Sequence, residues 1–209
     1  MTTSARRRLE RTGVVLLNWR DEEATVECIA SLSQIFEPQQ IVVVDNESTG
    51  RLGHLAAGTG VSIIELPENR GFAAGVNVGI AELLERGVDY ILALNTDTEV
   101  FADGLLPLFD DSAWPAGVGA AGPVILNSEG TVQSAGARFY PLTFRVRAHR
   151  VVRPAARIDF ITWACALISS STLRDIGLLD ERFFMYWEDV EFGIRMRSAG
   201  LRIVVAQDA

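Results

Sequence analysis

Short apolar runs rich in Val, Ile and Leu alternate with longer amphipathic stretches through the first half of the chain. The runs have the length and β-branched content of buried strands, and the stretches between them have helical spacing. The runs occupy residues 14–17, 41–44, 61–64 and 90–94, and the clearest helical stretches occupy 22–32 and 73–85. Strands joined by crossover helices build a mostly parallel sheet with helices on both faces. The pattern therefore predicts an α/β fold.

The alternation breaks after Asp110. A further strand is predicted over residues 118–125 and a helix over 188–198, whereas residues 138–157 show little periodicity. The sequence contains no internal repeat and no linker rich in Pro, Gly or Ser. We therefore expect one domain, in which the second half of the chain extends the fold that the first half begins.

Composition narrows the class of protein. A chain of 209 residues that is 48% hydrophobic and 22% charged is typical of a soluble globular domain. The net charge of −8 argues against general nucleic-acid binding. No apolar run approaches the roughly 20 residues that span a bilayer, and none follows Arg6–Arg8 as in an export signal. Cys28 lies inside a helical pattern and Cys165 inside the apolar run over residues 160–168, so no disulfide framework is indicated and a reducing cytosol fits.

Polar side chains follow three of the predicted strands at the point where each strand ends. Asn18 follows the first strand, Asp45 and Asn46 follow the second, and Asn95 and Asp97 follow the strand over 90–94. The carboxyl ends of parallel strands share one rim, and open α/β sheets bind ligands there. Asp and Asn are also common turn residues, so ordinary turn chemistry is the alternative. The coincidence of three polar strand ends favours a binding site.

The chemistry of this rim suits a nucleoside diphosphate. A carboxylate such as Asp97 at the end of a buried strand suits Mg²⁺ or Mn²⁺, and such a cation suits a diphosphate. Asp45 can accept the N3–H of uracil or thymine, a donor that adenine lacks. The first strand leads into NWRDEE without the glycine-rich turn of a dinucleotide site, and no GxxxxGKS or GxxxxGKT loop occurs.

Glycines mark the segment NRGFAAGVNVG, which begins at Asn69. Gly71 precedes a predicted helix and can let the backbone approach a ligand. Close packing is the alternative, and we favour it for Gly75 and Gly79.

An aromatic cluster runs directly into acidic residues at Glu188 and Asp189. An apolar wall beside a carboxylate can raise its pKa into the range of a general base. The alternative is an ordinary helix whose acids precede its bases, as the helix dipole favours. The residues of the expected wall are Phe183, Phe184, Tyr186 and Trp187.

In this order, the motifs NW, VDNES, ENRGFAAGVN, LNTDTEV and LLDERFFMYWEDVEFGIRMRSAG resemble the inverting family 2 glycosyltransferases, within them the rhamnosyltransferase-like group. The resemblance runs from Gly13 to the end and implies a single GT-A-type Rossmann-like domain. Residues 1–110 would be its nucleotide-binding half and 111–209 its acceptor and catalytic half. The implied reaction moves a sugar, rhamnose in first place, from a dTDP- or UDP-sugar to a glycan or polyprenyl-diphosphate-linked acceptor in cell-wall or polysaccharide biosynthesis.

The resemblance also implies roles for single residues. Asp189 matches the catalytic base and Glu188 its partner, while Asp45 matches the base-reading aspartate. Asp97 matches the aspartate that binds Mg²⁺ or Mn²⁺, but Asn95 stands where the DxD-type motif has its first Asp. Metal binding is therefore expected to rest on Asp97 and the diphosphate. Together with the strand-end argument, the residues expected near the nucleotide are Asn18, Asp45, Asn46, Asn69, Gly71, Asn77 and Asn95.

Three further expectations concern the surroundings of the site. The family usually continues to a His that helps to ligate metal or diphosphate, so we expect a chain that ends at Ala209 to be shortened. Residues 138–157 hold six Arg and no acid, and predict either contact with anionic lipid at the inner face of the cell membrane or a solvated loop. A nucleotide-sugar-binding module without transfer activity, and a phosphotransferase with Asp97 as nucleophile, stay open as alternative functions.

Overall fold

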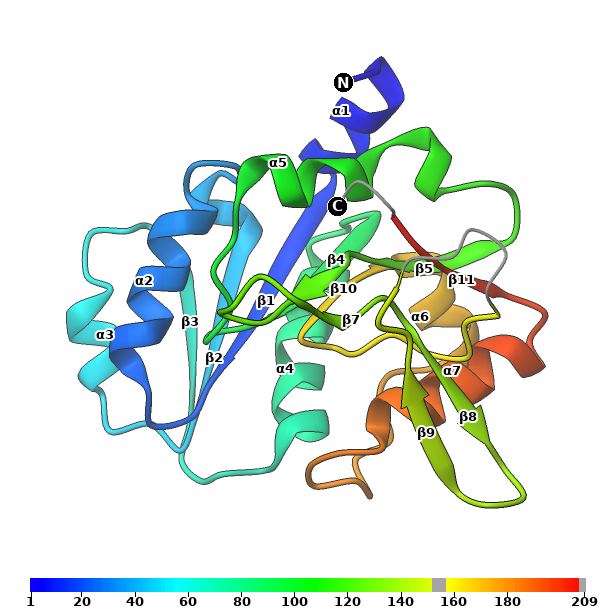
Figure 1. The fold of residues 1–209 in the computed structure, drawn as a ribbon. Helices are drawn as coiled ribbons and strands as arrows, with labels where there is room; N and C mark the ends of the chain where they lie inside the picture. The colour runs from blue at the N-terminus through cyan, green and yellow to red at the C-terminus, as the bar shows by residue number, and fades with distance from the viewer. Residues whose placement is uncertain (152–156, 207–209) are drawn as a thin grey trace.

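The computed structural model describes residues 1–151 and 157–206 as a layered α/β structure (Figure 1). The helices are α1 (Thr3–Glu10), α2 (Glu22–Leu32), α3 (Arg51–Leu55), α4 (Phe72–Glu85), α5 (Ala102–Leu105), α6 (Ser170–Ile176) and α7 (Glu188–Ser198). The strands are β1 (Thr12–Asn18), β2 (Ile41–Asn46), β3 (Ser62–Leu66), β4 (Tyr90–Asn95), β5 (Val118–Gly122), β6 (Ile125–Leu126), β7 (Val132–Ser134), β8 (Ala137–Tyr140), β9 (Arg145–Ala148), β10 (Cys165–Ser169) and β11 (Arg202–Val205). Short 3-10 turns lie at Pro38–Gln40, Leu106–Phe109 and Asp111–Ala113.

Seven strands form one sheet in the order β11-β5-β10-β4-β1-β2-β3. β1 pairs in parallel with β2 and with β4, whereas β10 runs antiparallel to both β4 and β5. The chain winds outward from β1 to β3 and then returns to the other side of β1 as β4. Such a reversal is the place where open α/β sheets hold their ligands. The expected α/β fold with a mostly parallel sheet is confirmed.

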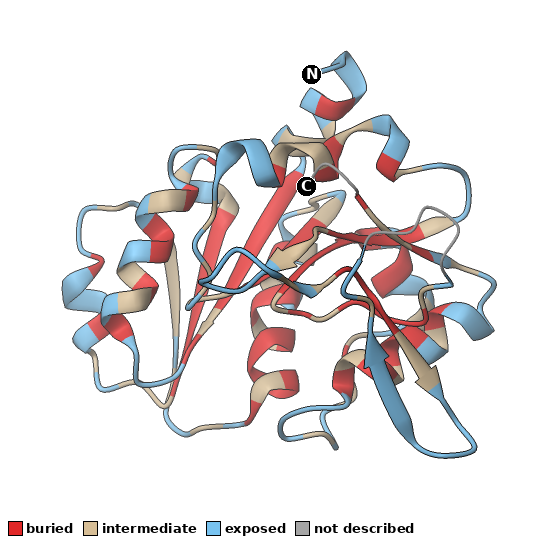
Figure 2. Ribbon diagram, in the orientation of Figure 1, coloured by how far each residue is buried: buried red, intermediate tan, exposed pale blue. Residues whose placement is uncertain are grey.

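Helices cover both faces of the sheet, because strands that are apolar on both sides must be buried on both sides. On one face, α2 contributes Ile29 and Leu32 to a core that includes Leu16 and Leu92. On the other face, α4 and α7 pack on the sheet through residues such as Ile80 and Phe192. Figure 2 shows the resulting pattern of buried strands and exposed outer helix faces.

Within the described ranges, no helix combines the length and apolar character that crossing a bilayer requires. Cys28 and Cys165 are both buried and free, as expected for a chain without a disulfide framework. Burial raises the pKa of each thiol to about 12, so both stay protonated near neutral pH.

The second half differs from expectation in two places. The strand predicted over residues 118–125 ends at Gly122, because Pro123 has no N–H to donate to a ladder, and the chain continues as β6 in a separate pair with β7. The stretch 138–157, which shows little periodicity, begins inside the antiparallel hairpin of β8 and β9. Its residues 152–156 lie outside the described residues. The helix predicted over 188–198 coincides with α7.

Candidate active site

Asn18 and Asp45 meet at the carboxyl ends of β1 and β2. Asn18 Nδ2 donates to Asp45 Oδ1 at 2.7 Å, and the two residues are 0% and 2% exposed. Asn18 Oδ1 accepts from Thr25 Oγ1 at 2.9 Å, which links this pair to α2. The second carboxylate oxygen of Asp45, Oδ2, is buried and has no hydrogen-bond donor among the described residues. Because buried carboxylate oxygens are nearly always hydrogen-bonded, Oδ2 is an acceptor that a ligand N–H can satisfy.

A bridge that sequence reasoning does not reveal joins the same two strand ends. Trp19 Nε1 and Arg20 Nε donate to Glu47 Oε2 at 2.9 Å and 3.1 Å. These bonds hold the pKa of Glu47 below its ordinary value. Arg20 and Glu47 have φ angles of +59° and +86°, a conformation that costs free energy outside glycine and clusters at functional sites. The sequence signal that could have identified these three residues is their position directly after two strand ends.

Asn46, Asn69 and Gly71 shape the loop that leads into α4. Asn46 Nδ2 donates to Asn69 Oδ1 at 2.9 Å and to Gly71 O at 3.2 Å, while Asn46 Oδ1 accepts from Arg70 N at 2.9 Å. Gly71 has φ +83°, and a Cβ on it would lie 2.4 Å from Phe184 O. The glycine is therefore required by its positive φ and by close packing against Phe184. These contacts give all three residues a supporting role, and their contact with a nucleotide stays a prediction.

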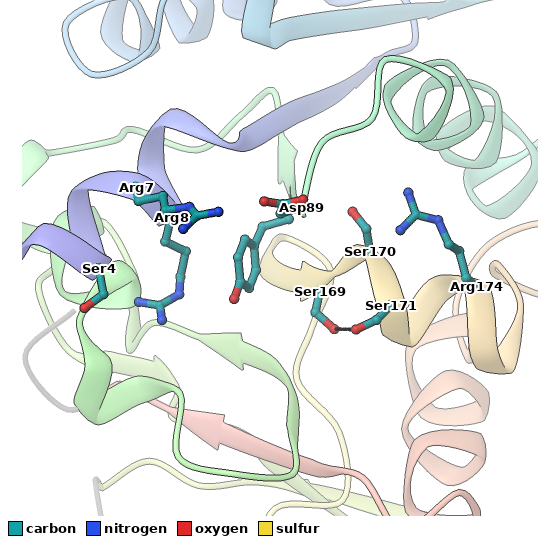
Figure 3. Close-up of a pocket in the computed structure, with 9 residues that line it drawn as sticks. Ser4, Arg7, Arg8, Asp89, Ser169, Ser170, Ser171 and Arg174 are labelled. Carbon is teal, nitrogen blue, oxygen red and sulfur yellow. Dashed lines mark hydrogen bonds between the residues drawn. The ribbon is translucent and has the colours of Figure 1, made fainter.

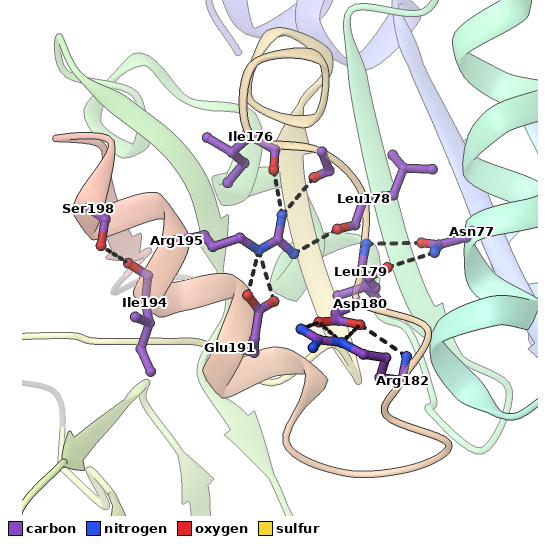
Figure 4. A network of polar contacts seen from close by, with 11 residues as sticks. Asn77, Ile176, Leu178, Leu179, Asp180, Arg182, Glu191, Ile194, Arg195 and Ser198 are labelled. Atoms are coloured by element: carbon purple, nitrogen blue, oxygen red, sulfur yellow. Dashed lines mark hydrogen bonds and ion pairs between the residues drawn. The ribbon is translucent and has the colours of Figure 1, made fainter.

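Asn77 faces the segment that precedes α7 (Figure 4). Its Nδ2 donates to Leu179 O at 2.8 Å and to Glu181 Oε1 at 3.1 Å, and its Oδ1 accepts from Leu179 N at 3.1 Å. Both amide hydrogens are thus used to tie α4 to residues 179–181. The predicted place of Asn77 beside the nucleotide has no support in these contacts.

Asn95 and Asp97 stand at the rim beside the end of β1. Asn95 is the last residue of β4 and lies opposite Leu17 in the β1–β4 ladder, and the exposed Asp97 follows in a turn. Within the described ranges, no group of three or more His, Cys, Asp and Glu side chains is arranged to hold a metal ion. A single exposed carboxylate nevertheless fits Mg²⁺ or Mn²⁺ when phosphate oxygens and water supply the other ligands.

Glu188 and Asp189 form the first turn of α7, directly after Tyr186 and Trp187, whose φ angles are +68° and +74°. Burial raises the pKa of Asp189, although a hydrogen bond from Val190 N at 2.7 Å opposes this. Burial also raises the pKa of Glu188, and the charge of Asp189 adds to the effect. Glu188 Oε2 is buried without a donor in the described part of the chain. The two carboxyl groups are therefore poised to hold or accept a proton.

The apolar wall beside Asp189 is built from other residues than those expected. Phe184 and Tyr186 are 56% and 74% exposed. Asp189 instead lines a narrow crevice with Trp163 and Phe192, whose rings meet edge to face at 5.2 Å. Trp163 reaches this place because β10 folds back along β4, a pairing that the local sequence does not indicate.

A network centred on Arg195 fixes α7 against the end of α6 (Figure 4). Arg195 Nε donates to both carboxylate oxygens of Glu191, at 2.7 Å and 2.9 Å. The remaining guanidinium nitrogens donate to Ile176 O at 2.5 Å, Gly177 O at 3.3 Å and Leu178 O at 2.7 Å. Glu191 and Arg195 thus fix the helix that carries Glu188 and Asp189 through direct hydrogen bonds, in addition to any interaction with the helix dipole.

A separate depression of about 410 Å³ lies at the opposite end of the strands, beside the start of β4 (Figure 3). It is lined by Arg7, Arg174 and Ser169 among others, at the level where Ser169 pairs with the first residue of β4, Tyr90. The rim that carries Asp97 is at the other end of β4, so this depression is not part of the candidate site.

The sequence of the chain is similar to those of known proteins. Residues 14–177 match the model described as glycosyl transferase family 2. The chain is 28% identical over 201 residues to the low-salt glycan biosynthesis hexosyltransferase Agl10 of Haloferax volcanii, which covers 93% of this chain and 64% of that protein. It is 30% identical over 203 residues to the N-acetylglucosaminyl-diphospho-decaprenol L-rhamnosyltransferase of Mycobacterium tuberculosis, which covers 82% and 66%. The chain thus spans slightly less than two thirds of the length of these relatives.

Solved structures show the same fold. GalNAc-T7 with UDP, GalNAc and Mn²⁺ aligns with a TM-score of 0.71 and 13% identity over 93% of this chain and 42% of that one. The mannosyltransferase PcManGT of Pyrobaculum calidifontis, in complex with GDP-Man and Mn²⁺, aligns with a TM-score of 0.65 and 16% identity over 98% and 60%. The expected GT-A arrangement is confirmed by this likeness.

Proposed function

Since the chain belongs to glycosyl transferase family 2, we propose that it transfers a sugar, with inversion, from a pyrimidine nucleotide sugar to a hydroxyl group. The favoured donor is dTDP- or UDP-linked, with rhamnose as the first candidate sugar. The favoured acceptor is a glycan or a polyprenyl-diphosphate-linked sugar. The name of the Mycobacterium tuberculosis relative, a rhamnosyltransferase acting on a decaprenol-linked sugar, supports both choices.

The observation that carries this proposal is the state of Asp45. Its Oδ1 accepts a hydrogen bond from Asn18, whereas its buried Oδ2 has no donor among the described residues. One buried acceptor beneath the rim can therefore accept a hydrogen bond from a ligand. The N3–H of uracil or thymine can donate a hydrogen bond to this oxygen, whereas adenine has no imide N–H. Guanine also carries a ring N–H, so a direct comparison of UDP and dTDP with GDP tests the choice of base.

Asp97 is the residue that would hold a divalent cation in this proposal, together with the diphosphate of the donor. A bound Mg²⁺ or Mn²⁺ would supply positive charge for the leaving diphosphate. The solved structures of GalNAc-T7 and PcManGT both contain Mn²⁺, which supports the choice of a divalent ion.

Asp189 takes the acceptor proton in the proposed mechanism. An inverting displacement needs a base on the side of the acceptor hydroxyl, and a carboxylate whose pKa is raised by burial suits that role. Glu188 is the partner of this base in the proposal, and burial together with the charge of Asp189 raises its pKa. The bonds of Arg195 to Glu191 and to Ile176 O fix the position of α7 relative to the end of α6.

A donor-binding module without transfer activity is the second candidate. It is favoured by Asn95, a neutral residue that stands where the DxD-type motif has its first Asp, so that metal binding would rest on Asp97 and the diphosphate. Both candidates bind donor at the rim, and only the first releases free nucleoside diphosphate in step with acceptor glycosylation.

A thermal-shift panel tests the shared premise. UDP and dTDP, each with and without Mn²⁺, should raise the melting temperature, and NAD should not. A ligand at about 100 times its Kd stabilises the folded state by roughly 2.7 kcal/mol. Asp45→Asn keeps the bond to Asn18 but turns Oδ2 into a donor, so it should abolish the shift by pyrimidine nucleotides. Asp97→Asn should abolish only its Mn²⁺-dependent part.

Asp103→Asn is the matched control, since Asp103 is an exposed carboxylate in α5, away from the strand ends. Unchanged shifts in the Asp45 variant, or a larger shift with GDP than with UDP, would refute the assignment of Asp45 to a pyrimidine base. Equal Mn²⁺ effects in the parent and Asp97→Asn would remove Asp97 from the metal site.

A further inference from the structure

We propose that the hairpin of β8 and β9 is a membrane-docking element, which inserts its tip into a bilayer and sets its arginines against anionic lipid headgroups. The hairpin projects from the body of the molecule beside α7, and β9 is exposed along its whole length (Figures 1 and 2). The inference rests on the proposed function in one respect, since a lipid-linked acceptor requires an enzyme that works at a membrane surface.

The tip of the hairpin, residues 141–144, presents large apolar side chains to water. Leu142 is 100% exposed and Phe144 is 75% exposed. Phe144 also has φ +50°, a conformation that is rare for a bulky residue. Two such side chains at the end of a projecting element leave most of their apolar surface in water, whereas hydrocarbon would remove it from water.

One face of the hairpin is basic. Arg138 lies directly opposite Arg147 in the ladder, and Tyr140 lies opposite Arg145. Like charges in directly opposite positions destabilise a sheet unless anions neutralise them. Arg138 is 4.0 Å from Asp159, but Arg145 and Arg147 have no ion-pair partner among residues 1–151 and 157–206. The unneutralised pair on β9 therefore fits an anionic surface.

Two other arginines near the hairpin are already paired with an acid. Arg157 pairs with the buried Asp159 at 2.8 Å, and Arg197 of α7 also contacts that carboxylate. The chain as a whole carries a net charge of −8, which opposes general attraction to anionic lipid. Docking must then come from one surface whose positive charge is free, and the hairpin is such a surface.

The opposite face of the hairpin connects the tip to the proposed base. The ring of Phe139 meets that of Phe144 at 6.2 Å and that of Trp187 at 6.1 Å. Trp187 directly precedes Glu188 and Asp189. These three rings form an aromatic strip that runs from the tip to the start of α7. Docking through the tip therefore turns the acceptor side of the candidate site towards the bilayer.

Co-sedimentation with vesicles tests the proposal without any need for turnover. The protein should pellet with vesicles of phosphatidylcholine and phosphatidylglycerol, and weakly with phosphatidylcholine alone. Arg145→Gln with Arg147→Gln should lower the partition coefficient about 25-fold, since each basic residue at an anionic surface contributes roughly a factor of five. Leu142→Ser with Phe144→Ser should lower it by at least about tenfold.

Matched controls separate position from composition. Arg6→Gln with Arg7→Gln removes two exposed arginines from α1, and Leu55→Ser with Leu126→Ser removes two exposed apolar side chains elsewhere. Both controls should pellet like the parent. Equal losses of vesicle binding in the controls and the hairpin variants would overturn the proposal. The proposal would also be overturned if inorganic phosphate released the protein from the vesicles more than chloride does at equal ionic strength.

Two further outcomes are decisive. A dimer in light scattering that the hairpin variants dissociate, with no vesicle binding, would show that a second copy of the chain covers this surface and would overturn the proposal. The nucleotide thermal shift of each variant is measured in parallel. A hairpin variant that loses vesicle binding but keeps its nucleotide thermal shift supports docking by the hairpin. If the parent chain shows no nucleotide thermal shift, only the proposed function is refuted.

Discussion

At Asp189, burial and a local hydrogen bond act on one carboxyl group in opposite directions, and burial dominates, so its pKa is raised. Asp189→Asn preserves the shape and the bond from Val190 N while removing the base. We expect sugar transfer to slow by about 10² to 10⁴, with donor binding unchanged. The measurement is kcat with a saturating donor, and Asp175→Asn, an exposed position on α6, is the control.

The raised pKa also fixes the sign of two pH effects. The base acts when deprotonated, so the rate of the parent should fall as pH drops through the raised pKa of Asp189, and the residual rate of Asp189→Asn should lack this limb. Because the folded state binds this proton more tightly than the unfolded state, stability falls as pH rises from the unfolded value of about 3.9 to the folded pKa. The variant should therefore melt at or above the parent near pH 7. A rate within a few-fold of the parent would remove Asp189 as the base.

Gly71 shows a single residue setting the distance between two elements. A Cβ there would meet Phe184 O at 2.4 Å, and its φ of +83° strains any other residue. Gly71→Ala should destabilise the fold by about 1 to 3 kcal/mol more than Gly87→Ala, which has φ +75° and open space around it. Chemical denaturation of both variants measures the difference. Equal losses would show that only backbone strain matters at Gly71.

Single residues differ in how far the sequence predicts their roles. Asn18, Asp45 and Asp97 are found at strand ends because strand ends are visible in the apolar pattern. The bonds of Asn77 to Leu179 join residues 102 positions apart, and no local pattern encodes such a partner. Trp163 escapes for the same reason, since its place beside Asp189 follows from the antiparallel return of β10.

At the scale of elements, the Arg195 network decides where α7 lies. Arg195→Lys loses the two-oxygen contact with Glu191 and most of the bonds to three carbonyls, because an ammonium group cannot reproduce the planar fork. We expect a loss of about 2 kcal/mol, or roughly 4 to 8 °C in Tm. Arg182→Lys should change Tm little, because the side chain of Arg182 is 87% exposed and its ion pair with Asp180 lies near the surface. Thermal melts compare the two, and similar shifts would mean that the network adds no more than a surface ion pair.

Elements with long apolar or periodic signals are predicted, and those defined by their partners are not. The four strands of the first half and α7 follow from local patterns. The hairpin of β8 and β9 has only four residues in each strand, and the alternation of arginine with apolar residues over Arg145–Ala148 is too short to distinguish from a solvated loop. Its identity as a pair depends on the register Arg138↔Arg147, which is a tertiary fact.

At the scale of the whole molecule, the two halves of the chain meet side by side in one sheet, at the pairing of β4 with β10. β4 from the first half lies between β1 and β10, β10 also pairs with β5, and β5 pairs with β11. Residues 1–110 alone would leave the β10 edge of β4 unpaired and its buried side chains Ile91 and Leu92 without their neighbours Ile168 and Leu167. The assignment of two functional halves to one domain stays a prediction, and unfolding cooperativity tests it.

Tryptophan probes make that test specific, since Trp19 reports on the first half and the 3% exposed Trp163 on the second. Two variants are needed, one with Trp19 and one with Trp163 as its only tryptophan. In each variant, fluorescence and far-UV circular dichroism should give the same midpoint in urea, because a shared sheet melts as one cooperative unit. The 1–110 fragment should fail to show a cooperative transition. If the two probes gave separate midpoints, or if the fragment folded alone, the halves would be independent domains. The first turn of α7 would then be held against the rim only by an interface between domains, and mutations there would weaken transfer without lowering the stability of the nucleotide-binding half.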